Sequence, residues 1–574
     1  MRELATDILI LGSGGAGLFA ALHAHQAAPR LSITVAVKGL LGKCGCTRMV
    51  QGGYNVALAA GDSVERHFMD TIEGGKWLPN QDLAWKLVTL AVERIHELEN
   101  ELGCFFDRNP DGTVHQKAFA GQTFDRTVHK GDLTGIEIIN RLAEQVWARD
   151  IRRLEEHRAV ELIKARGDEA ISGVLFIDMR TGEYALVRAK AVLLATGGGP
   201  TMYRYHTPSG DKSCDGLAMA LRAGLALRDM EMVQFHPTGL LAGAHTRMTG
   251  TVLEEGLRGA GGYLLDANHE RFMHKYDPKL ERATRDIVSR AIFSEMRAGR
   301  VTPNGGVYIS MAHLGRDKVT KAFKGMVERC ADCGFDLAGG LVEVVPTAHY
   351  MMGGVEFEPD CATALPGLFV AGEDAGGVHG ANRLGGNGVA NSTVFGGVAG
   401  ETMAARVAAG GVLREPDRAQ LDAALARCER PFANKPSTRG GIEATRETLY
   451  DLMWHKVGII RDAAGLRAAL SALDAIETDL DATSLADHNR AFNLSWHDWM
   501  NLKSLVEVSR VIARAAAARE DSRGAHFRDD FPAAGALEAS AYTSATIGAD
   551  GVAIAMRPVA FTRVRPGESL LAAA

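Results

Sequence analysis

Residues 7–17 read DILILGSGGAG, and this stretch decides the fold. Residues 7–11 have the length and apolar character of a buried strand, and the glycines that follow predict a tight turn. A helical pattern runs from Ala16 to about Ala28, and LSITVAV at 31–37 has the pattern of a second strand. Strand, helix and strand in this order predict a βαβ unit, the start of a doubly wound α/β domain.

The glycines follow the spacing Gly12-x-Gly14-x-x-Gly17 between the strand and the helix. The first glycine makes the turn, the second lets backbone N–H groups approach a pyrophosphate, and the third lets helix and strand pack closely. The pattern predicts a dinucleotide site. The acid that usually follows about 20 residues later is absent, since Lys38 stands there. Glu373, in AGED, is therefore the candidate for contacting the ribose.

Two more strands end in glycines, AKAVLLATGGGP at 189–200 and PGLFVAGEDAGG at 366–377, and an apolar helix begins at about Asn391. One sheet that gathers these strands must be discontinuous, with a second domain inserted into it. Helical spacing recurs in segments 417–430, 438–460, 463–480 and 496–519. The predicted units are a nucleotide-binding domain at 1–233 and 346–405, an inserted domain at 234–345, a helical domain at 415–525 and a short-stranded C-terminal extension at 526–574.

The composition limits the function classes. The chain has 574 residues, more than one core usually holds, and its net charge of −6 offers no basis for binding nucleic acid or an anionic membrane. No apolar run approaches the roughly 18–20 residues that span a bilayer. The N-terminus enters a strand without a basic segment or cleavage site. We expect a cytoplasmic protein that binds no nucleic acid and does not insert directly into a membrane.

The eight cysteines are sparse for this length, which favours reduced thiols over a disulfide framework. CADC at 330–333 is a lone CxxC pair. Structural zinc and iron–sulfur sites need about four ligands, and no second pair is available. We therefore expect no metal site in this chain.

Five short segments combine His, Arg and Gly next to predicted strand ends. A lone His is more often a core residue than a ligand, and a lone Arg is more often a surface charge, so each segment alone has a purely structural interpretation. Their common composition favours a shared chemical site. The segments are VQFHPTG (233–239), VLEEGLRGAGG (252–262), ATRDIVSRA (283–291), VPTAHYMMGG (345–354) and HGANRLGGNG (379–388).

These ordered motifs resemble the flavoprotein subunit of the succinate dehydrogenase/fumarate reductase family, which includes L-aspartate oxidase. The resemblance covers about residues 5–405 and continues more weakly through 454–461 and 520–532. It implies a Rossmann-like FAD-binding domain, an inserted α+β capping domain and a C-terminal helical domain. It also implies hydride transfer between flavin N5 and the carbon α,β to a carboxylate of a small (di)carboxylic acid.

The resemblance also implies roles for individual residues. Arg383 clamps a substrate carboxylate, which a planar guanidinium can do with two parallel hydrogen bonds. Arg285 carries the proton on the face opposite the flavin, through a relay formed by Glu255 and Arg258. The further substrate-binding positions are His236, His349, Glu254 and Gln122. The FAD-binding positions are Gly12, Gly14, Gly15, Ala16, Gly17, Lys38, Cys46, Thr47, Gln51, Gly52, Gly53, Thr196, Gly197, Gly198, Asp215, Glu373, Arg383 and Asn387.

The loop GKCGCTRMVQGG at 42–53 aligns with the segment that touches the flavin ring. In membrane-bound respiratory relatives the position of Cys46 is a histidine bonded to the flavin 8α-methyl group, whereas aspartate oxidases lack it and hold FAD without a bond. We expect noncovalent FAD, with an 8α-thioether to Cys46 as the alternative. A metal site or a disulfide between Cys44 and Cys46 is disfavoured, because one intervening residue is poor geometry for both.

Two departures from the family pattern leave the substrate open. Glu254 replaces the usual threonine and would repel a dicarboxylate, unless it turns away into solvent or the substrate carries an amine or hydroxyl. GGNGVAN at 385–391 replaces the usual serine-bearing segment. The alternative function is amino-acid oxidation like that of L-aspartate oxidase, with Glu254 or Asp125 meeting the ammonium group. A flavin-bearing electron carrier with an inactive site is a third interpretation, and an iron–sulfur subunit is the partner that the resemblance suggests.

Overall fold

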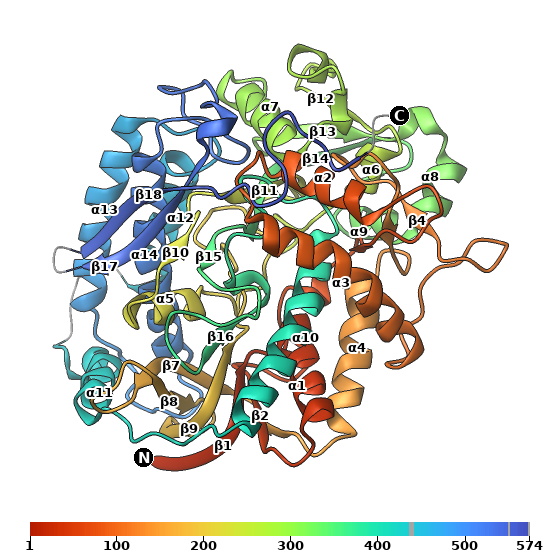
Figure 1. Ribbon diagram of the computed structural model, residues 1–574. Helices are drawn as coiled ribbons and strands as arrows, with labels where there is room; N and C mark the ends of the chain where they lie inside the picture. Colours follow the sequence, from red (N-terminus) through yellow and green to blue (C-terminus); the bar gives the residue numbers. More distant parts are fainter. Residues whose placement is uncertain (436–440, 549–550, 572–574) are drawn as a thin grey trace.

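This computed structural model describes residues 1–435, 441–548 and 551–571, and a large sheet occupies the lower part of the molecule in Figure 1. Its strand order is β6-β2-β1-β9-β8-β7, and β16 also pairs with β9. Strands β6, β2, β1, β9 and β16 pair in parallel, whereas β7, β8 and β9 pair antiparallel. The bounds are β1 Arg2–Leu11, β2 Ile33–Ala36, β6 Arg152–Leu154, β7 His157–Lys164, β8 Ile171–Asp178, β9 Glu183–Leu194 and β16 Leu368–Val370. The predicted discontinuous α/β sheet is confirmed.

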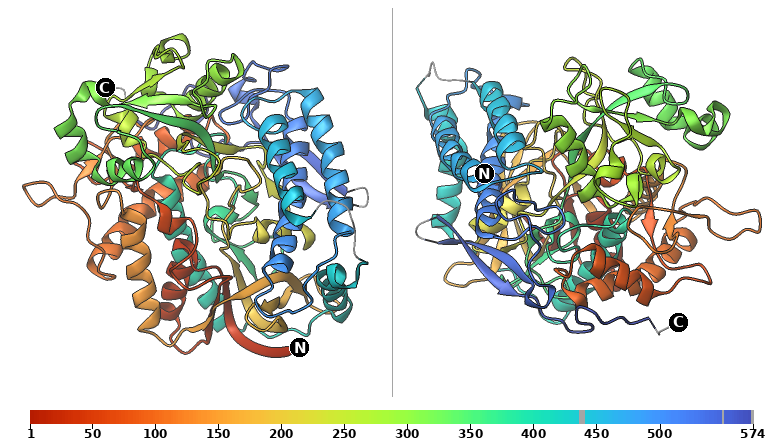
Figure 2. Two further views of the ribbon diagram at one scale, coloured as in Figure 1. Left: turned by 180° about the vertical axis from the view of Figure 1, so that it is seen from behind. Right: turned by 90° about the horizontal axis from the view of Figure 1, so that it is seen from above.

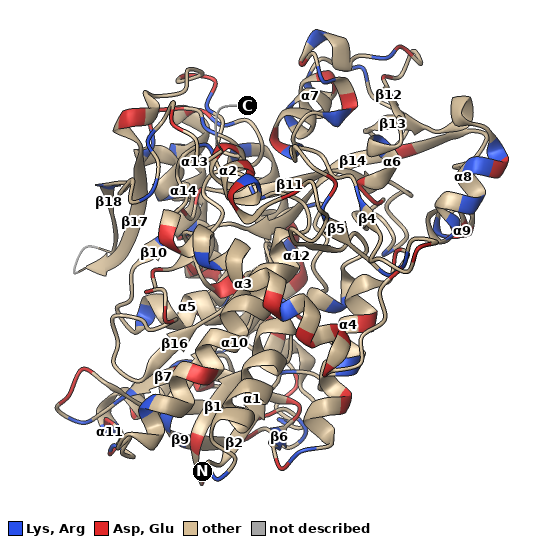
Figure 3. Cartoon of the chain, turned by 45° about the vertical axis from the view of Figure 1, so that its right-hand side comes forward, with Lys and Arg blue, Asp and Glu red and all other residues tan. Residues whose placement is uncertain are grey.

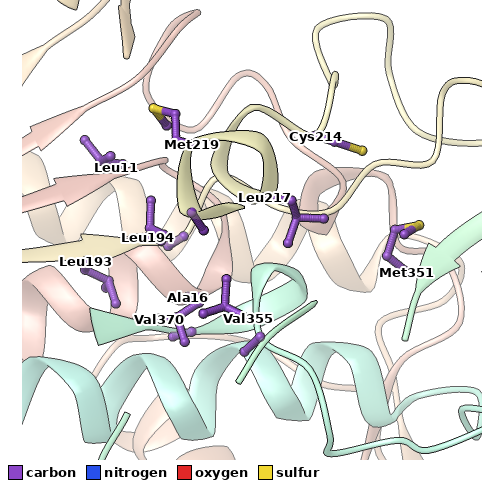
Figure 4. Packing of buried hydrophobic residues seen from close by; sticks show 14 of the residues in the cluster. Leu11, Ala16, Leu193, Leu194, Cys214, Leu217, Met219, Met351, Val355 and Val370 are labelled. Atoms are coloured by element: carbon purple, nitrogen blue, oxygen red, sulfur yellow. The ribbon is translucent and has the colours of Figure 1, made fainter. Parts of the chain in front are cut away.

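The glycine turn joins β1 to α1 (Gly15–Ala27) where several strands end. Gly12 has φ +108°, and a Cβ there would lie 2.1 Å from the Ala195 carbonyl oxygen. A Cβ on Gly17 would lie 2.0 Å from the Gly12 carbonyl oxygen, so helix and strand approach too closely for any side chain. Figure 4 shows the apolar ends of the neighbouring elements gathered around this turn, including Leu11, Ala16, Leu194 and Val370. The turn is therefore built into the central core.

Helices cover the large sheet. Helix α10 (Asn387–Ala408) packs against α1, and Gly396 allows this because its Cβ would lie 2.6 Å from the Ala16 carbonyl oxygen. The other helices of this part are α2 Val64–Gly74, α3 Gln81–Asn100, α4 Thr134–Trp147 and α5 Asp215–Arg222. A small sheet of order β3-β5-β4 lies nearby, with bounds β3 Tyr54–Asn55, β4 Gln116–Lys117 and β5 Thr127–Val128.

A second sheet has its own hydrophobic core. Its order is β11-β14-β13-β12, with bounds β11 Val233–Leu240, β12 Tyr263–Leu265, β13 Val307–Ser310 and β14 Leu341–Met351. The helices around it are α6 Gly256–Gly259, α7 Arg285–Arg297, α8 Arg316–Ala322 and α9 Lys324–Asp332. The buried residues of this core all lie between Leu240 and Val344. A separate core supports the predicted capping domain at 234–345, although the predicted limits fall inside β11 and β14; the domain division stays a prediction.

In the described part of the chain four helices follow α10, with bounds α11 Arg418–Ala433, α12 Ile442–Lys456, α13 Ala463–Asp481 and α14 Leu494–Ala518. They match the four predicted helical segments, of which residues 438–440 lie outside the described residues. In both views of Figure 2 these light-blue helices lie on the side of the molecule away from the green α8 and α9. Within the described ranges, none of the helices has the length and hydropathy to cross a bilayer.

The C-terminal segment adds a hairpin to a small sheet whose other strands belong to the predicted nucleotide-binding domain. Strands β17 (Ala541–Gly548) and β18 (Gly551–Pro558) pair with each other, and β17 also pairs with β10 (Leu227–Arg228). Strand β15 (Gly354–Val355) completes this sheet. The expectation of short strands in 526–574 is met for the described residues; 549–550 and 572–574 lie outside them. The short 3-10 helices are η1 Thr47–Met49, η2 Met273–Lys275, η3 Leu280–Arg282, η4 Ala312–Leu314, η5 Gly372–Asp374 and η6 Leu537–Ala539.

The glycine turn gives a test of the fold. We expect Gly12→Ala to lower the free energy of unfolding by about 3 kcal/mol, because the new Cβ meets the Ala195 carbonyl and the backbone has a positive φ. Gly14→Ala is the matched control, since the nearest atom to its Cβ would be Thr47 Oγ1 at 3.6 Å. Urea unfolding of the apoprotein measures both. Equal stabilities of the two variants would contradict the packing described here.

Candidate active site

A cavity of about 680 Å³ lies where the glycine turn, the loop 42–53, the second sheet and the start of α10 meet. Most of the predicted site residues line it. They are Gly14, Gly15, Ala16, Cys46, Thr47, Gln51, Gly52, Gly53, Thr196, Gly197, His236, Glu254, Glu255, Arg285, His349, Glu373 and Arg383. Gly12, Lys38 and Asp215 line a smaller adjoining cavity of about 60 Å³. The two cavities share the glycine turn, so they form one elongated path.

The remaining predicted residues do not line either cavity. Gly17 and Gly198 are packed against other atoms, and a Cβ on Gly198 would lie 2.7 Å from the Met351 side chain. Asn387 turns away, because its amide oxygen accepts hydrogen bonds from Asn55 and its amide nitrogen donates to Thr71. Gln122 borders a separate cavity and donates from Nε2 to the Gly385 carbonyl at 3.0 Å.

The glycine turn fits the pyrophosphate of FAD. The 13-residue helix α1 begins at the cavity wall. The backbone N–H groups at the start of a helix and the helix dipole favour the binding of an anion there. Thr47 Oγ1 accepts from the Gly15 N–H at 3.1 Å and ties the flavin loop to the turn. The Ser13 hydroxyl is buried and has no partner in the described part of the chain. The space beside Gly14 is open enough to admit a ligand.

A buried ion-pair network lines the smaller cavity. Lys38 Nζ donates to Asp215 Oδ2 at 2.8 Å, and Arg158 Nη2 donates to Asp215 Oδ1 at 2.8 Å. Burial raises the pKa of Asp215, but Arg158 and Lys38 outweigh this effect and leave the pKa lowered. Asn501, from α14, accepts from both cations at 2.7 and 3.3 Å. Arg158 and Asn501 were missed by the sequence analysis, because no motif marks them.

Glu373 lies in the larger cavity rather than beside Lys38. Its carboxylate accepts from the Met351 N–H at 2.9 Å, and burial raises its pKa to about 7. Next to it, Asp374 accepts from the backbone N–H groups of Thr196 and Gly197. Backbone N–H groups at the strand-end glycines therefore donate hydrogen bonds to a carboxylate of the AGED segment. These bonds hold the two motifs, which are distant in sequence, side by side in the wall of the cavity.

The loop 42–53 is stretched along the cavity. A Cβ on Gly52 would lie 2.4 Å from the Phe119 ring, and Gly53 has φ +145°, so both positions require glycine. Cys44 and Cys46 are free thiols, as are the other six cysteines. Burial, followed by the charge of Glu373, raises the pKa of Cys46 to about 12. The described residues contain no group of three or more His, Cys, Asp or Glu side chains that could hold a metal ion.

Two histidines come from neighbouring strands of the second sheet. His236 in β11 pairs in register with Thr347, which places it beside His349 in β14, and the ring centroids are 5.4 Å apart. Burial, reinforced by Arg285, holds the pKa of both histidines well below the ordinary value. His349 Nδ1 lies 2.8 Å from Thr207 Oγ1, which orients the ring. Both imidazoles are therefore neutral and can act as hydrogen-bond donors.

Arg285 begins α7 and is held by two acceptors. Its Nη2 and Nε donate to Glu255 Oε2 at 2.6 and 3.0 Å, and its Nη1 donates to Gln234 Oε1 at 3.0 Å. The other oxygen of Glu255 accepts from Arg258 at 3.1 Å. Burial raises the pKa of Glu255, but Arg285 and Arg258 outweigh it and leave the pKa lowered. Arg258 itself is fully buried, and its Nη1 donates to the Glu281 carbonyl at 2.7 Å.

Arg383 lies over the Tyr350 ring at 4.4 Å and shares an acceptor with Arg285. Its Nη2 donates to Gln234 Oε1 at 3.1 Å, while Gln234 Nε2 donates to the Arg383 carbonyl at 2.7 Å. Its Nε is buried without a partner in the described part of the chain. Burial, followed by the charge of Arg285, lowers the pKa of Arg383 to about 10. Gln234 thus bridges two cations, although the sequence analysis did not single it out within VQFHPTG.

The position of Glu254 excludes one of the alternatives. Its side chain does not turn into solvent: the residue is only 5% exposed, lines the cavity and forms an ion pair with Lys117. Asp125, the other residue considered for meeting an ammonium group, is exposed and lies outside both cavities. Its position in the loop between β4 and β5 carries it to the surface, so it cannot contact a ligand in this site.

Comparisons with known proteins agree with this geometry. Residues 7–389 match the family model for an FAD binding domain, and residues 446–570 match that for the fumarate reductase flavoprotein C-terminus. A polypeptide of the fumarate reductase (CoM/CoB) of Methanothermobacter marburgensis is 38% identical over 92% of this chain and 94% of its own length. The Escherichia coli fumarate reductase flavoprotein subunit is 34% identical over 92% of this chain and 89% of its own length.

Solved structures give the same result. The flavoprotein in a structure of Escherichia coli quinol fumarate reductase superimposes with a TM-score of 0.92 at 32% identity, covering 99% of both chains. These sequence identities, over nearly the full length of both chains, are higher than a shared fold alone requires. The chain belongs to the succinate dehydrogenase/fumarate reductase flavoprotein family and is an FAD-dependent oxidoreductase.

Proposed function

We propose that this protein transfers a hydride between FAD and the carbon α,β to the carboxylate of a small organic acid, with Arg285, Arg383, His236 and His349 forming the substrate site. The observation that carries the proposal is the pair of buried guanidinium groups that share Gln234 on the wall of the cavity. When bound along the path from Lys38 to Glu373, FAD supplies the two-electron donor or acceptor.

The proposed clamp acts on the substrate carboxylate. Arg383 retains unpaired donor capacity, since Nε has no partner among the described residues and Nη1 makes only a 3.3 Å contact with the Leu384 carbonyl. A carboxylate that accepts two hydrogen bonds from a guanidinium is fixed in position and in plane. The neutral histidines can donate to the same anion. Fixing the carboxylate positions the neighbouring carbon atoms and stabilises negative charge that develops on them.

The proposed proton path uses the second arginine. Arg285 faces the cavity and can protonate the carbon next to the one that receives hydride. An arginine is a poor acid because its pKa is so high, so it serves only toward a strongly basic carbanion. Glu255 contacts Arg285 with one oxygen and Arg258 with the other, and can return the proton. Burial lowers the pKa of Arg258, which eases proton transfer at that end. Oxidation would use the same groups in reverse.

The rival interpretations are less well supported. None of the relatives reported above is an aspartate oxidase, and Asp125 lies on the surface, so amino-acid oxidation loses one of its two candidate contacts. An electron carrier without its own chemistry gives no reason to bury Arg383 in the cavity wall without an ion pair among the described residues, since burying unpaired charge is costly.

We also propose noncovalent FAD and an electron-transfer partner. The high pKa of Cys46 keeps its sulfur as a thiol, which is a weak nucleophile, so the 8α-thioether is disfavoured. The relatives named above are subunits of fumarate reductases, and we propose that this chain likewise docks an iron–sulfur subunit. The eight free thiols fit a reducing compartment, and we propose the cytoplasm.

Reoxidation of the reduced flavin tests the function. After anaerobic photoreduction, an α,β-unsaturated carboxylate from a panel that includes fumarate and fumaramate should restore the visible band of wild-type enzyme. Arg285→Lys should bind FAD but reoxidise at least about 1,000-fold more slowly, because lysine cannot hold Glu255 and Gln234 together while facing the cavity. Arg282→Lys, at an exposed site three residues earlier, is the control and should behave like wild type. Recovery only in air with aspartate would instead support the oxidase.

Gln234 gives a second test. Gln234→Leu leaves Arg285 and Arg383 without their common acceptor, and we expect kcat/KM to fall at least about 30-fold while FAD remains bound. Gln234→Glu keeps the acceptor but removes one net positive charge, so its main effect should be a higher KM. Steady-state kinetics on both variants separate the two effects. An unchanged kcat/KM in the leucine variant would contradict the bridging role.

Acid precipitation tests the flavin attachment. With no bond between Cys46 and the flavin, trichloroacetic acid should release yellow FAD into the supernatant from wild type and from Cys46→Ala alike. Colour that stays in the wild-type pellet but leaves the Cys46→Ala pellet would show the thioether instead.

A further inference from the structure

Glu254 presents a carboxylate to the cavity, in addition to Glu255. Glu254 lines the cavity, whereas its partner Lys117 does not, so the ammonium group lies behind the carboxylate. Lys117 belongs to β4 and Glu254 to the segment just before α6, so the ion pair joins the central domain to the second sheet's domain. Figures 1 and 3 both show β4 close to α6. The pair is buried, with side-chain exposures of 19% for Lys117 and 6% for Glu254.

The charges around Glu254 are mostly negative. Asp132 lines the same cavity, and Glu255 is adjacent in the chain. Burial raises the pKa of Glu254 and Asp132 raises it further, whereas Lys117 lowers it. The direct contact with the Lys117 ammonium favours the ionised carboxylate, because a protonated Glu254 would leave a partly buried lysine unpaired. Glu254 and Asp132 thus bring two carboxylates to the cavity wall, and Lys117 is paired with Glu254.

The Phe119 ring lies in the cavity wall close to both charged groups. A Cβ on Gly385 would lie 2.7 Å from this ring and 3.0 Å from Arg285 Nη2. Lys117 Nζ, which is paired with Glu254, lies 5.8 Å from the ring centroid. The cavity wall around Phe119 therefore presents the Arg285 guanidinium and the Glu254 carboxylate, which carry opposite charge.

Arg329, in α9, also lines the cavity, as do Lys43, Arg48 and Lys212. Arg329 Nη1 donates to the Val252 carbonyl at 3.0 Å, and Arg329 forms no ion pair among the described residues. Because this guanidinium lines the cavity without an ion pair, a substitution of Arg329 distinguishes a site that binds one substrate carboxylate from a site that binds two.

We propose that the substrate has a single carboxylate and, at its opposite end, a neutral or cationic hydrogen-bond donor such as an amide, a hydroxyl or an amine. This inference rests on the proposed function. The carboxylate binds Arg285 and Arg383, and the donor binds Glu254. A dicarboxylate would place its second anion against Glu254 and Asp132, so the site selects against fumarate and succinate by like-charge repulsion.

The reaction balances with the cofactor already established. In the reductive direction the π bond between the α and β carbons breaks, one carbon receives a hydride from reduced FAD, and the other receives a proton from Arg285. The acid gains two electrons and two hydrogens, FAD is the oxidation product, and the distal donor takes no part in the chemistry. Glu254 is therefore a specificity-determining residue.

Binding of saturated acids tests this without turnover. Titrations of the oxidised holoenzyme, followed by calorimetry and the visible flavin band, should give Kd values for succinamate and 4-aminobutanoate at least about tenfold below that for succinate. In Glu254→Gln the 4-aminobutanoate Kd should rise and the succinate Kd should fall, so that the preference shrinks or reverses. The flavin content of the variant shows that it is folded. Reoxidation rates with fumaramate, 4-aminobut-2-enoate and fumarate should follow the same order.

Arg329→Gln is the matched control. If Arg329 does not meet the substrate, this variant should keep the wild-type order of Kd values. Tighter binding of succinate than of succinamate in wild type, with no change in Glu254→Gln, would overturn the inference while leaving the proposed function intact. Loss of tight succinate binding in Arg329→Gln would likewise overturn it, by assigning a second carboxylate to Arg329. If no unsaturated acid reoxidised the flavin, the proposed function would fail and the inference with it.

Discussion

Three buried guanidinium groups are held together by one carboxylate and one amide, and the rest of the site depends on this arrangement. Glu255 binds Arg285 and Arg258, and Gln234 bridges Arg285 and Arg383. Within this cluster one negative charge faces three positive charges. Because burying charge costs several kcal/mol per ion, a cluster left with excess positive charge gains most from an anion that completes it. A substrate carboxylate supplies that anion, so affinity and position come from the same contacts.

The fold explains how such a cluster can form. Arg285, Glu255 and Arg258 come from the domain with the second core, Arg383 comes from the segment before α10, and Gln234 lies at the start of β11. The charged groups therefore meet only when the two domains are packed together. The glycine turn, the AGED segment and the loop 42–53 form the remaining walls and leave an elongated path that suits a dinucleotide. Cofactor and substrate thus occupy one continuous cavity.

Sequence patterns predicted the βαβ unit and the inserted segment, because glycine spacing and strand periodicity are local signals, whereas most residues of the cavity wall were identified through the family resemblance. Sequence patterns failed where a side chain is defined by a distant partner. Gln234 meets Arg383 across 149 positions, and Lys117 meets Glu254 across 137, and no periodicity marks either pair. Asn387 was expected at the cofactor, but its amide is taken up by Asn55 and Thr71. A residue type predicts what a side chain can do, whereas only packing decides which way it points.

The structure of the flavin-loaded enzyme with a bound saturated carboxylate tests the central account most directly. The account requires the carboxylate to accept hydrogen bonds from Arg383 and Arg285, with the adjacent carbon–carbon bond lying between the flavin ring and the Arg285 guanidinium. A carboxylate bound elsewhere, or guanidinium groups that turn away from the acid, would contradict it.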